Sequence, residues 1–183
     1  MSLIRAARVQ DAGAITAIYN QAIEERQATF ETRVRAVAEF SDALGHPGLP
    51  FLVLETGGRV LGWARMARYS ERECYRGVGE ASIYVAREAR GRGLGARLAQ
   101  ALMREAELRG YWKIIGLLFA SNRASLRLCR ACGFREVGTL RCHARLDGRW
   151  RDVVIAERLL GPAAQAAGAP ARGTVQAARD SGF

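Results

Sequence analysis

A glycine-rich segment between a predicted strand and a predicted helix constrains this chain more than any other feature. It reads Arg90-Gly-Arg-Gly-Leu-Gly-Ala96. Glycine lets the backbone approach a ligand closely and adopt dihedral angles that other residues avoid. A helix that begins here presents unpaired N–H groups and the positive end of its dipole. The segment therefore predicts an anion site suited to a diphosphate. It would be formed by Arg90, Gly91, Arg92, Gly93, Leu94, Gly95 and Ala96, with both arginines at its mouth.

Two other folds that use glycine loops do not match this pattern. A P-loop ends in Gly-Lys-Ser/Thr, and this segment does not. A dinucleotide-binding fold places its loop after the first strand and an acidic residue at the end of the next strand. Here the loop follows the fourth predicted strand, and the next strand ends in Leu118-Phe119. Taken alone, the loop is also compatible with a turn that merely packs a helix against a sheet.

Hydrophobic periodicity predicts strands and helices in mixed order. Strands are expected at residues 3–6, 51–55, 60–68, 78–86, 113–119, 134–145 and 150–159. Helices are expected at residues 11–23, 34–44, 93–109 and 122–132. The order has hairpins early and late and crossover helices in the middle. It predicts an α/β fold in which helices cover both faces of a mixed sheet, a three-layer α/β/α domain.

Length and composition indicate one domain, expected at residues 1–160. The chain has 183 residues, of which 49% are hydrophobic, and this suffices for a single core. Residues 161–183 are mostly Ala, Gly, Pro and Arg, so we expect a flexible tail there. No apolar run reaches the length of a membrane span, and the N-terminus does not resemble a secretory signal. We therefore expect a cytoplasmic protein with no membrane partner.

Charge and cysteine content point to no nucleic-acid or metal function. The net charge is +10, but the arginines are dispersed and no nucleic-acid-recognition signature is found. Cys129, Cys132, Cys142 and His143 resemble a zinc-binding set on paper. However, Cys142 and His143 are neighbours in a predicted strand, so their side chains point to opposite faces. We expect no bound metal and interpret the cysteines as free, mostly buried thiols.

Two segments together resemble one known superfamily. Ile83-Tyr84-Val85 followed by Arg90-x-x-Gly93-x-Gly95 resembles the acyl-CoA diphosphate motif of the GNAT superfamily of N-acetyltransferases. Residues 122–125 and 128–134 resemble the downstream segment of that superfamily. The resemblance covers about residues 3–160. It implies a splayed central sheet, acetyl-CoA as co-substrate, and Asn122 and Ser125 as further cofactor contacts.

Within the superfamily, the chain resembles the phosphinothricin and methionine sulfoximine acetyltransferase group. Tyr75-Arg76-Gly77 with Glu80, and the segment 148–153, carry this resemblance. It implies acetylation of the α-amino group of a small amino acid or analogue, and a homodimer. Tyr75 and Arg76 are then expected to bind the substrate, because a guanidinium can hold a carboxylate through two parallel hydrogen bonds. A surface salt bridge of Arg76 is the alternative.

The resemblance also implies roles in catalysis. Glu80, a single acid in an apolar strand, is the candidate base for the incoming ammonium, directly or through water; the alternative is a solvent-facing acid. The N–H of Val85 is the candidate oxyanion donor, and Ile83, Tyr84 and Val85 are expected to pair with the pantetheine arm. Asn122 is expected to bond the pantetheine or to order the loop after the fifth strand.

The proton donor for the departing thiolate is the least defined role. Many superfamily members carry a tyrosine where this chain has Cys129. Cys129 is therefore a candidate catalytic acid, although a buried, inert thiol is the competing interpretation. Tyr84, water or unassisted departure of the thiolate are alternatives. No role is assigned to His143.

Three functions remain open from the sequence. The first is an N-acetyltransferase for a small amine that bears a carboxylate. The second is an acetyltransferase for another amine, such as a protein N-terminus or a polyamine. The third is an acyl-CoA-binding or nucleic-acid-binding module without catalysis.

Overall fold

The computed structural model describes residues 2–45 and 48–168. Seven strands form one sheet: β1 (Ser2–Ala6), β2 (Phe51–Thr56), β3 (Arg59–Arg68), β4 (Val78–Val85), β5 (Lys113–Phe119), β6 (Arg135–Leu146) and β7 (Arg149–Leu159). The α-helices are α1 (Ala12–Glu25), α2 (Val37–Gly45), α3 (Leu94–Leu108), α4 (Arg123–Ala131) and α5 (Gly161–Gly168). Each strand and helix expected up to residue 160 is present, in the expected order.

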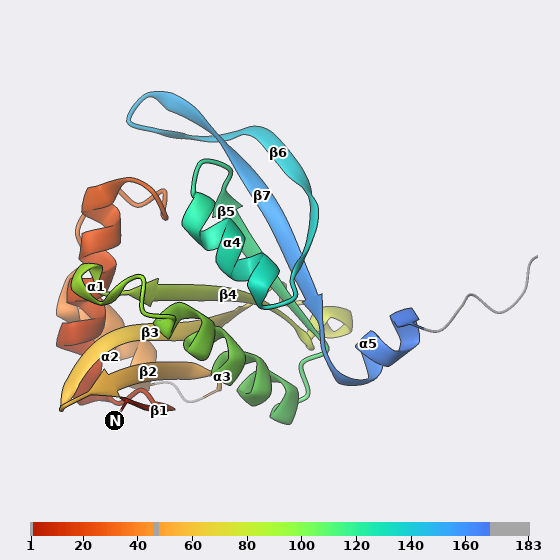
Figure 1. Cartoon of the computed structure of the whole chain (residues 1–183), viewed down its shortest axis with the longest axis horizontal. Helices are drawn as coiled ribbons and strands as arrows, with labels where there is room; N and C mark the ends of the chain where they lie inside the picture. The colour runs from red at the N-terminus through yellow and green to blue at the C-terminus, as the bar shows by residue number, and fades with distance from the viewer. Residues whose placement is uncertain (1, 46–47, 169–183) are drawn as a thin grey trace, which may run out of the picture.

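The sheet is mixed, with the order β1-β2-β3-β4-β5-β7-β6. Only β4 and β5 run parallel; every other neighbouring pair is antiparallel. Helices α3 and α4 lie on one face, in front of the sheet in Figure 1, and α1 and α2 lie on the other. The prediction of a mixed sheet between two helical layers is therefore confirmed.

Side chains along β3 point alternately to the two faces of the sheet, and in this way the strand contacts both helical layers. The indole N–H of Trp63 donates to the carbonyl of Ile15 in α1 at 3.2 Å. On the opposite face, Gly62 lies so close to Leu98 of α3 that an added Cβ would come within 3.0 Å of it. The odd-numbered residues of β3 therefore face α1, and the even-numbered ones face α3.

The parallel ladder between β4 and β5 is much shorter than the others. It pairs only Val78, Gly79 and Glu80 with Lys113, Ile114 and Ile115. Beyond Ile115, β5 continues to pair with β7 but no longer with β4. The two central strands therefore separate after Glu80, and this splay opens the sheet at its middle.

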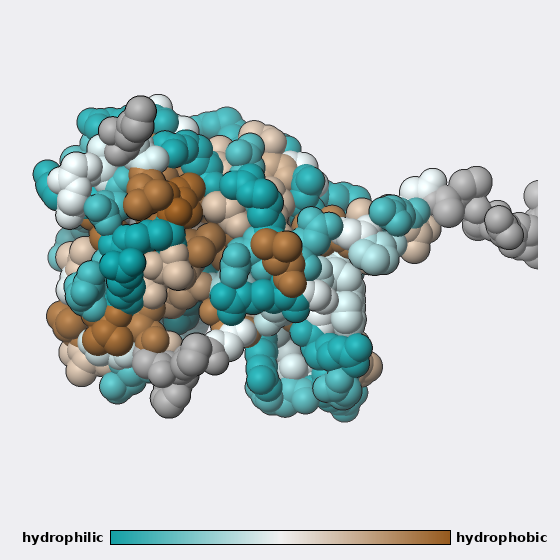
Figure 2. Space-filling model, turned by 90° about the horizontal axis from the view of Figure 1, so that it is seen from below, coloured by the Kyte–Doolittle hydropathy of each residue, from teal (hydrophilic) through white to brown (hydrophobic). Residues whose placement is uncertain are grey.

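The C-terminal segment differs in part from the expectation of a flexible tail. Residues 161–168 form α5, and the main-chain N–H of Leu160 just before it donates to Trp112 at 2.9 Å. The helix is largely exposed and projects from the rest of the molecule in Figures 1 and 2. Its Ala-rich sequence has high helix propensity, so this segment can be helical although it buries little surface. Residues 169–183 of the expected tail lie outside the described residues.

Candidate active site

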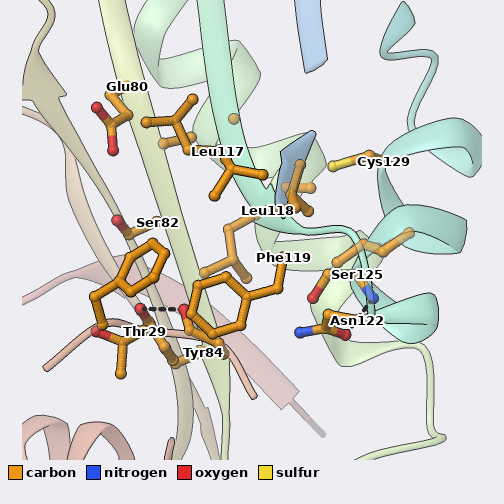
Figure 3. A pocket seen from close by; sticks show the side chains of 18 of the residues that line it. Thr29, Glu80, Ser82, Tyr84, Leu117, Leu118, Phe119, Asn122, Ser125 and Cys129 are labelled. Carbon is orange, nitrogen blue, oxygen red and sulfur yellow. Dashed lines mark hydrogen bonds between the residues drawn. The ribbon is translucent and has the colours of Figure 1, made fainter. Parts of the chain in front are cut away.

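A cleft of about 460 Å³ occupies the gap between β4 and β5. Its walls come from residues 80–84 of β4, residues 116–119 of β5, one side of α4 and the loop 28–31. Glu80, Ser82 and Tyr84 follow one another along β4, and Leu117, Leu118 and Phe119 of β5 and Cys129 of α4 lie opposite (Figure 3). The size and the largely apolar lining suit a small organic ligand.

The main chain of β4 offers unpaired polar groups along this cleft. The N–H of Ala86 donates to Leu61 at 2.9 Å, so the even-numbered residues of β4 pair with β3. In an antiparallel ladder the alternate residues point the other way. The N–H and C=O groups of Ile83 and the N–H of Val85 therefore face the gap that β5 has left, whereas the C=O of Val85 accepts from Arg90. An extended ligand can pair with this edge as an added strand.

The glycine-rich loop has the geometry expected of an anion site. Gly91 and Gly93 both have positive φ angles, +77° and +74°, and a Cβ on either would point into open space. Gly93 is the N-cap of α3. Gly95 packs against Leu128 of α4, at 3.2 Å from an added Cβ. The loop thus leaves the first main-chain N–H groups of α3, from Leu94 to Ala96, available to an anion. Gly95 also keeps α3 and α4 close together.

The two arginines of this loop have different environments. Arg90 donates to the main-chain carbonyl of Val85 at 3.1 Å and to the carboxylate of Glu25 at 2.8 Å. Burial raises the pKa of Glu25, but hydrogen bonds from Arg87 and Arg90 outweigh it and lower that pKa below its usual range. Arg90 therefore fastens the loop to the end of α1, whereas Arg92 is exposed and has no ion-pair partner among the described residues.

Asn122 connects two walls of the cleft. Its side-chain oxygen accepts from the N–H of Ser125 at 3.0 Å and caps α4, as short polar residues do at helix N-termini. Its side-chain N–H donates to the carbonyl of Gln27 at 3.0 Å. A few residues on, the rings of Phe30 and Phe119 pack with centroids 4.6 Å apart. Asn122 thus orders the loop 26–31 against the end of β5.

Glu80 lies where β4 and β5 separate. It is the last residue of β4 paired with β5, and its carboxylate lines the cleft, partly buried. It makes no side-chain hydrogen bond or ion pair with any of the described residues. Val85 lies five positions further along the strand, about 17 Å at the usual rise per residue. The structure therefore does not bring the Val85 N–H next to the Glu80 carboxylate; the Ile83 N–H lies nearer.

Cys129 and Tyr84 line the cleft but are weak proton donors. Burial raises the pKa of the Cys129 thiol to about 11, above the value of about 8.5 for an ordinary thiol. Burial, followed by the neighbouring Tyr19, also raises the pKa of Tyr84 above its usual range. The ring of Tyr84 packs against Trp63 with centroids 4.6 Å apart. Both environments favour a structural role over proton donation to a thiolate.

Tyr75 and Arg76 lie outside this cleft. Both line a separate pocket, in which Arg76 donates to the carboxylate of Glu73 at 2.8 Å. The ring of Tyr75 packs against Tyr69 with centroids 5.5 Å apart. The structure therefore does not join these two residues to Glu80 within one chain. Their expected contact with the substrate stays a prediction.

Sequence reasoning missed several residues of the cleft. Arg65 of β3 and Ser82 of β4 line it, as do Thr29 and Phe30 of the loop after α1. Arg65 could have been found by the signal used for Glu80, because it is a charged residue inside an apolar strand. His143 also lines the cleft, although no role was assigned to it. In residues 2–45 and 48–168, no three His, Cys, Asp or Glu side chains are grouped so as to hold a metal ion.

The four cysteines are free thiols in the structure. Cys74 and Cys142 are exposed, Cys129 is half-buried and Cys132 is buried. The expectation of mostly buried thiols thus holds for the pair on or beside α4 but not for the other two. None of the helices in the described part of the chain has the length and apolar character needed to cross a bilayer.

Comparisons with known proteins agree with this geometry. The chain is 39% identical to a phosphinothricin N-acetyltransferase of Alcaligenes faecalis over 166 residues, which cover 86% of this chain and 82% of the relative. It is 36% identical to an L-methionine sulfoximine/L-methionine sulfone acetyltransferase of Pseudomonas paraeruginosa, over 87% of this chain and 95% of the relative.

A solved structure and a family model complete the comparison. The crystal structure of a GNAT superfamily phosphinothricin acetyltransferase from Sinorhizobium meliloti, in complex with AcCoA, has a TM-score of 0.84 and 30% identity to this chain, covering 95% of both. The family model described as Acetyltransferase (GNAT) family matches residues 15–134. The splayed sheet, the glycine loop and these matches agree: the chain belongs to the GNAT family of acetyltransferases.

Proposed function

We propose that this protein transfers the acetyl group of acetyl-CoA to the α-amino group of a small amino acid or analogue, of the phosphinothricin or methionine sulfoximine type. The observation that carries the proposal is the cleft between β4 and β5, with Glu80 at its vertex and the glycine loop at the far end of β4. The names of the relatives support the class of acceptor.

The chain's own groups fit acetyl-CoA. The amides at the start of α3 and the open backbone of Gly91 and Gly93 hold the diphosphate, and Arg92 adds charge beside it. The main-chain edge at Ile83 and Val85 binds the pantetheine arm in the manner of an added strand. Asn122 and Ser125 close the opposite side. Acetyl-CoA supplies the activated acyl group as a thioester.

Glu80 acts as the base of the reaction. The acceptor amine is an ammonium ion at neutral pH, so it loses one proton before its nitrogen can form the new C–N bond. The Glu80 carboxylate takes this proton, directly or through one water molecule. The C–S bond breaks as the C–N bond forms, and the nitrogen gives its second proton to solvent as it becomes the amide. The sulfur leaves as a thiolate that takes its proton from solvent. This route needs no proton from Cys129.

The N–H groups on the open edge of β4 stabilise the charge on the carbonyl oxygen. The sequence pointed to Val85 as this donor. Ile83 has the same direction in the ladder and lies nearer Glu80, so we place the reacting carbonyl at Ile83. Val85, whose carbonyl Arg90 already holds, is then part of the pantetheine site.

We further propose that the protein functions as a homodimer in the cytoplasm. β6 is an edge strand of the sheet, and Val137 and Trp150 on the β6–β7 hairpin are 48% and 56% exposed. An exposed edge with apolar side chains is suited to contact with a second chain. Light scattering coupled to size-exclusion chromatography measures this directly.

The proposed function is tested by release of free thiol from acetyl-CoA. The panel contains phosphinothricin, methionine sulfoximine, methionine sulfone, proteinogenic amino acids, a polyamine and a peptide with a free N-terminus. We expect turnover with the amino-acid analogues. Turnover with the polyamine or peptide alone would favour a different acceptor class, and acetyl-CoA binding without any turnover would favour a non-catalytic module. Calorimetry that detects no binding of acetyl-CoA to the folded protein would contradict all of these.

A further inference from the structure

Arg65 is a cation inside the cleft that the family resemblance does not explain. It lies in the middle of β3, in the apolar run Val60-Leu-Gly-Trp-Ala-Arg-Met-Ala67. Its Cα partner across the ladder is Ser82 of β4. By strand alternation its side chain is on the same face as Trp63, and it lines the cleft together with Glu80 and Ser82.

The guanidinium of Arg65 has no partner on the described part of the chain. Its Nε atom is buried and makes no hydrogen bond there, and no carboxylate of residues 2–45 and 48–168 pairs with it. A buried donor without an acceptor costs about 1–3 kcal/mol. An acceptor supplied by a ligand in the cleft would remove this cost.

Two of the acids that share a hollow with Arg65 are already paired with other arginines, and the third, Glu80, forms no ion pair with Arg65. Glu31 and Glu39 line a smaller hollow that also contains Arg65. Arg35 forms ion pairs with both of these glutamates, and Arg33 forms a second ion pair with Glu39 at 3.1 Å. Arg65 therefore forms no ion pair with Glu31, Glu39 or Glu80, and its guanidinium is available to a ligand in a cleft whose walls are largely apolar.

Other arginines share either the unpaired Nε of Arg65 or its place in a pocket, but not both. Arg151 and Arg158 also have a buried Nε without a partner, but neither lines the cleft. Arg158 donates through Nη1 to the carbonyl of Cys132. Arg76 is paired with Glu73 in another pocket. Within the described residues, Arg65 is the arginine that is both unpaired and inside the site.

Arg65 lies where the α-carboxylate of an amino acid would be if its ammonium group were beside Glu80. Glu80 and Ser82 are two residues apart on the same face of β4, which separates their Cβ atoms by about 7 Å. Arg65 is directly opposite Ser82 and diagonal to Glu80. The acceptor's ammonium must lie beside Glu80, and its carboxylate is one carbon away from that nitrogen. A carboxylate placed there points towards the guanidinium of Arg65 and the hydroxyl of Ser82.

We propose that Arg65, assisted by Ser82, binds the α-carboxylate of the acceptor and thereby makes the enzyme selective for amino acids over simple amines. This inference rests on the proposed function and assigns the acceptor subsite within it. A planar guanidinium binds a carboxylate through two parallel hydrogen bonds, which fixes orientation as well as charge. The amine is then held at Glu80 with its lone pair directed towards the acyl group.

The test compares methionine sulfone with its carboxamide, which keeps the side chain and the α-amine but lacks the negative charge of the carboxylate. For the wild type we expect the acid to have a kcat/KM at least tenfold higher than the amide. In Arg65→Met we expect this preference to disappear through a rise in KM for the acid, whereas the values for the amide and for acetyl-CoA stay the same. Arg65→Lys keeps the charge but loses the paired hydrogen bonds, so it should be intermediate.

The control is Arg68→Met, in the same strand but exposed and paired with Glu71. It should retain the wild-type preference. If Arg65→Met kept the preference for the acid, or if Arg76→Met abolished it instead, the assignment to Arg65 would be overturned. Acetyl-CoA binding and the unfolding temperature show that each variant is folded; if Arg65→Met fails this check, Arg65→Lys carries the comparison.

A second measurement separates this inference from the proposed function. Both acceptors are titrated calorimetrically into the CoA-loaded wild type and the Arg65 variants. Binding of the acid that depends on Arg65, without turnover, would support the carboxylate site and refute the transfer reaction. Turnover with an undiminished acid preference in the Arg65 variants would refute the carboxylate site alone. Neither binding nor turnover in the wild type would refute both.

Discussion

The side-chain N–H of Asn122 donates to the main-chain carbonyl of Gln27 at 3.0 Å, across 95 residues of sequence. The same side chain caps α4 through Ser125. One amide thus holds both the helix that borders the cleft and the loop that closes it. This explains how a residue without a charge or a titratable group contributes to the site.

Replacement of Asn122 separates these two effects. Asn122→Ala should lower the free energy of unfolding by about 1–2 kcal/mol, because the cap and the loop contact are both lost. Asn122→Asp keeps an acceptor for Ser125 but has no N–H for Gln27. It should therefore unfold at nearly the wild-type temperature and yet show a raised KM for acetyl-CoA or the acceptor. Equal kinetics for Asn122→Asp and the wild type would contradict the role of the loop contact.

Glu80→Gln tests the proposed base. The amide cannot accept the proton of the ammonium, so kcat should fall by about 10²-fold or more. Acetyl-CoA affinity, measured by calorimetry, should not change, because the glycine loop is untouched. Glu71→Gln, an exposed acid in the preceding loop, serves as the matched control and should leave kcat unaltered. An unchanged kcat in Glu80→Gln at every pH would remove Glu80 from the mechanism.

Gly93→Ala tests the anion site at the start of α3. Gly93 and Gly110 both have positive φ angles, +74° and +80°, and open space where a Cβ would be. Alanine at either position should therefore cost a similar backbone strain of about 1–2 kcal/mol. Gly93 is the N-cap of α3, so only Gly93→Ala adds a methyl group at the proposed diphosphate site. We expect it to weaken acetyl-CoA binding at least tenfold in calorimetry, while Gly110→Ala binds as the wild type does.

Thiol modification tests the environment of the cysteines. At pH 8 a thiol with a pKa of about 11 is only about 0.1% thiolate, so Cys129 should react slowly with iodoacetamide. Cys74 and Cys142 are exposed and should react first, as peptide mass spectrometry can show. All four should react in denaturant. If Cys129 were the proton donor for the departing thiolate, Cys129→Ala would lower kcat; we expect no such loss.

The ion pair of Asp11 and Arg5 makes stability depend on pH. Asp11 is 5% exposed, and its hydrogen bond from Arg5 outweighs burial and lowers its pKa below the usual value of 3.8. The unfolded chain therefore binds this proton more readily than the folded chain. The stabilisation is complete above about pH 5 and is lost as the pH falls below 4 towards the folded pKa.

Asp11→Asn should accordingly destabilise the protein by about 3 kcal/mol at pH 7, because it breaks a largely buried pair. The difference from the wild type should shrink in denaturant unfolding at pH 3. Glu71→Gln again provides an exposed control, with a change of about 0.5 kcal/mol or less at both pH values. A difference for Asp11→Asn that is the same at pH 7 and pH 3 would contradict the assignment.

Much of the fold was predictable because its signals are local. The period of apolar residues distinguishes helices from strands within each segment, and the glycines at 91 and 93 mark a backbone that needs positive φ before a helix. The order of elements and the anion loop follow from these signals alone. The helix at 161–168 was missed because its evidence is propensity rather than buried surface.

The acceptor end of the site depends on contacts that no local pattern encodes. Arg76 is near Glu80 in the sequence, yet it pairs with Glu73 in another pocket. Arg65 is fifteen positions away from Glu80, yet strand register places it opposite Ser82 inside the cleft. The cleft itself exists because β4 and β5 pair for only three residues before they part. The sequence by itself determined the elements and the diphosphate loop, since these depend on neighbouring residues. Only the tertiary structure decided which charged side chains share the cleft, since pairing between distant strands sets that.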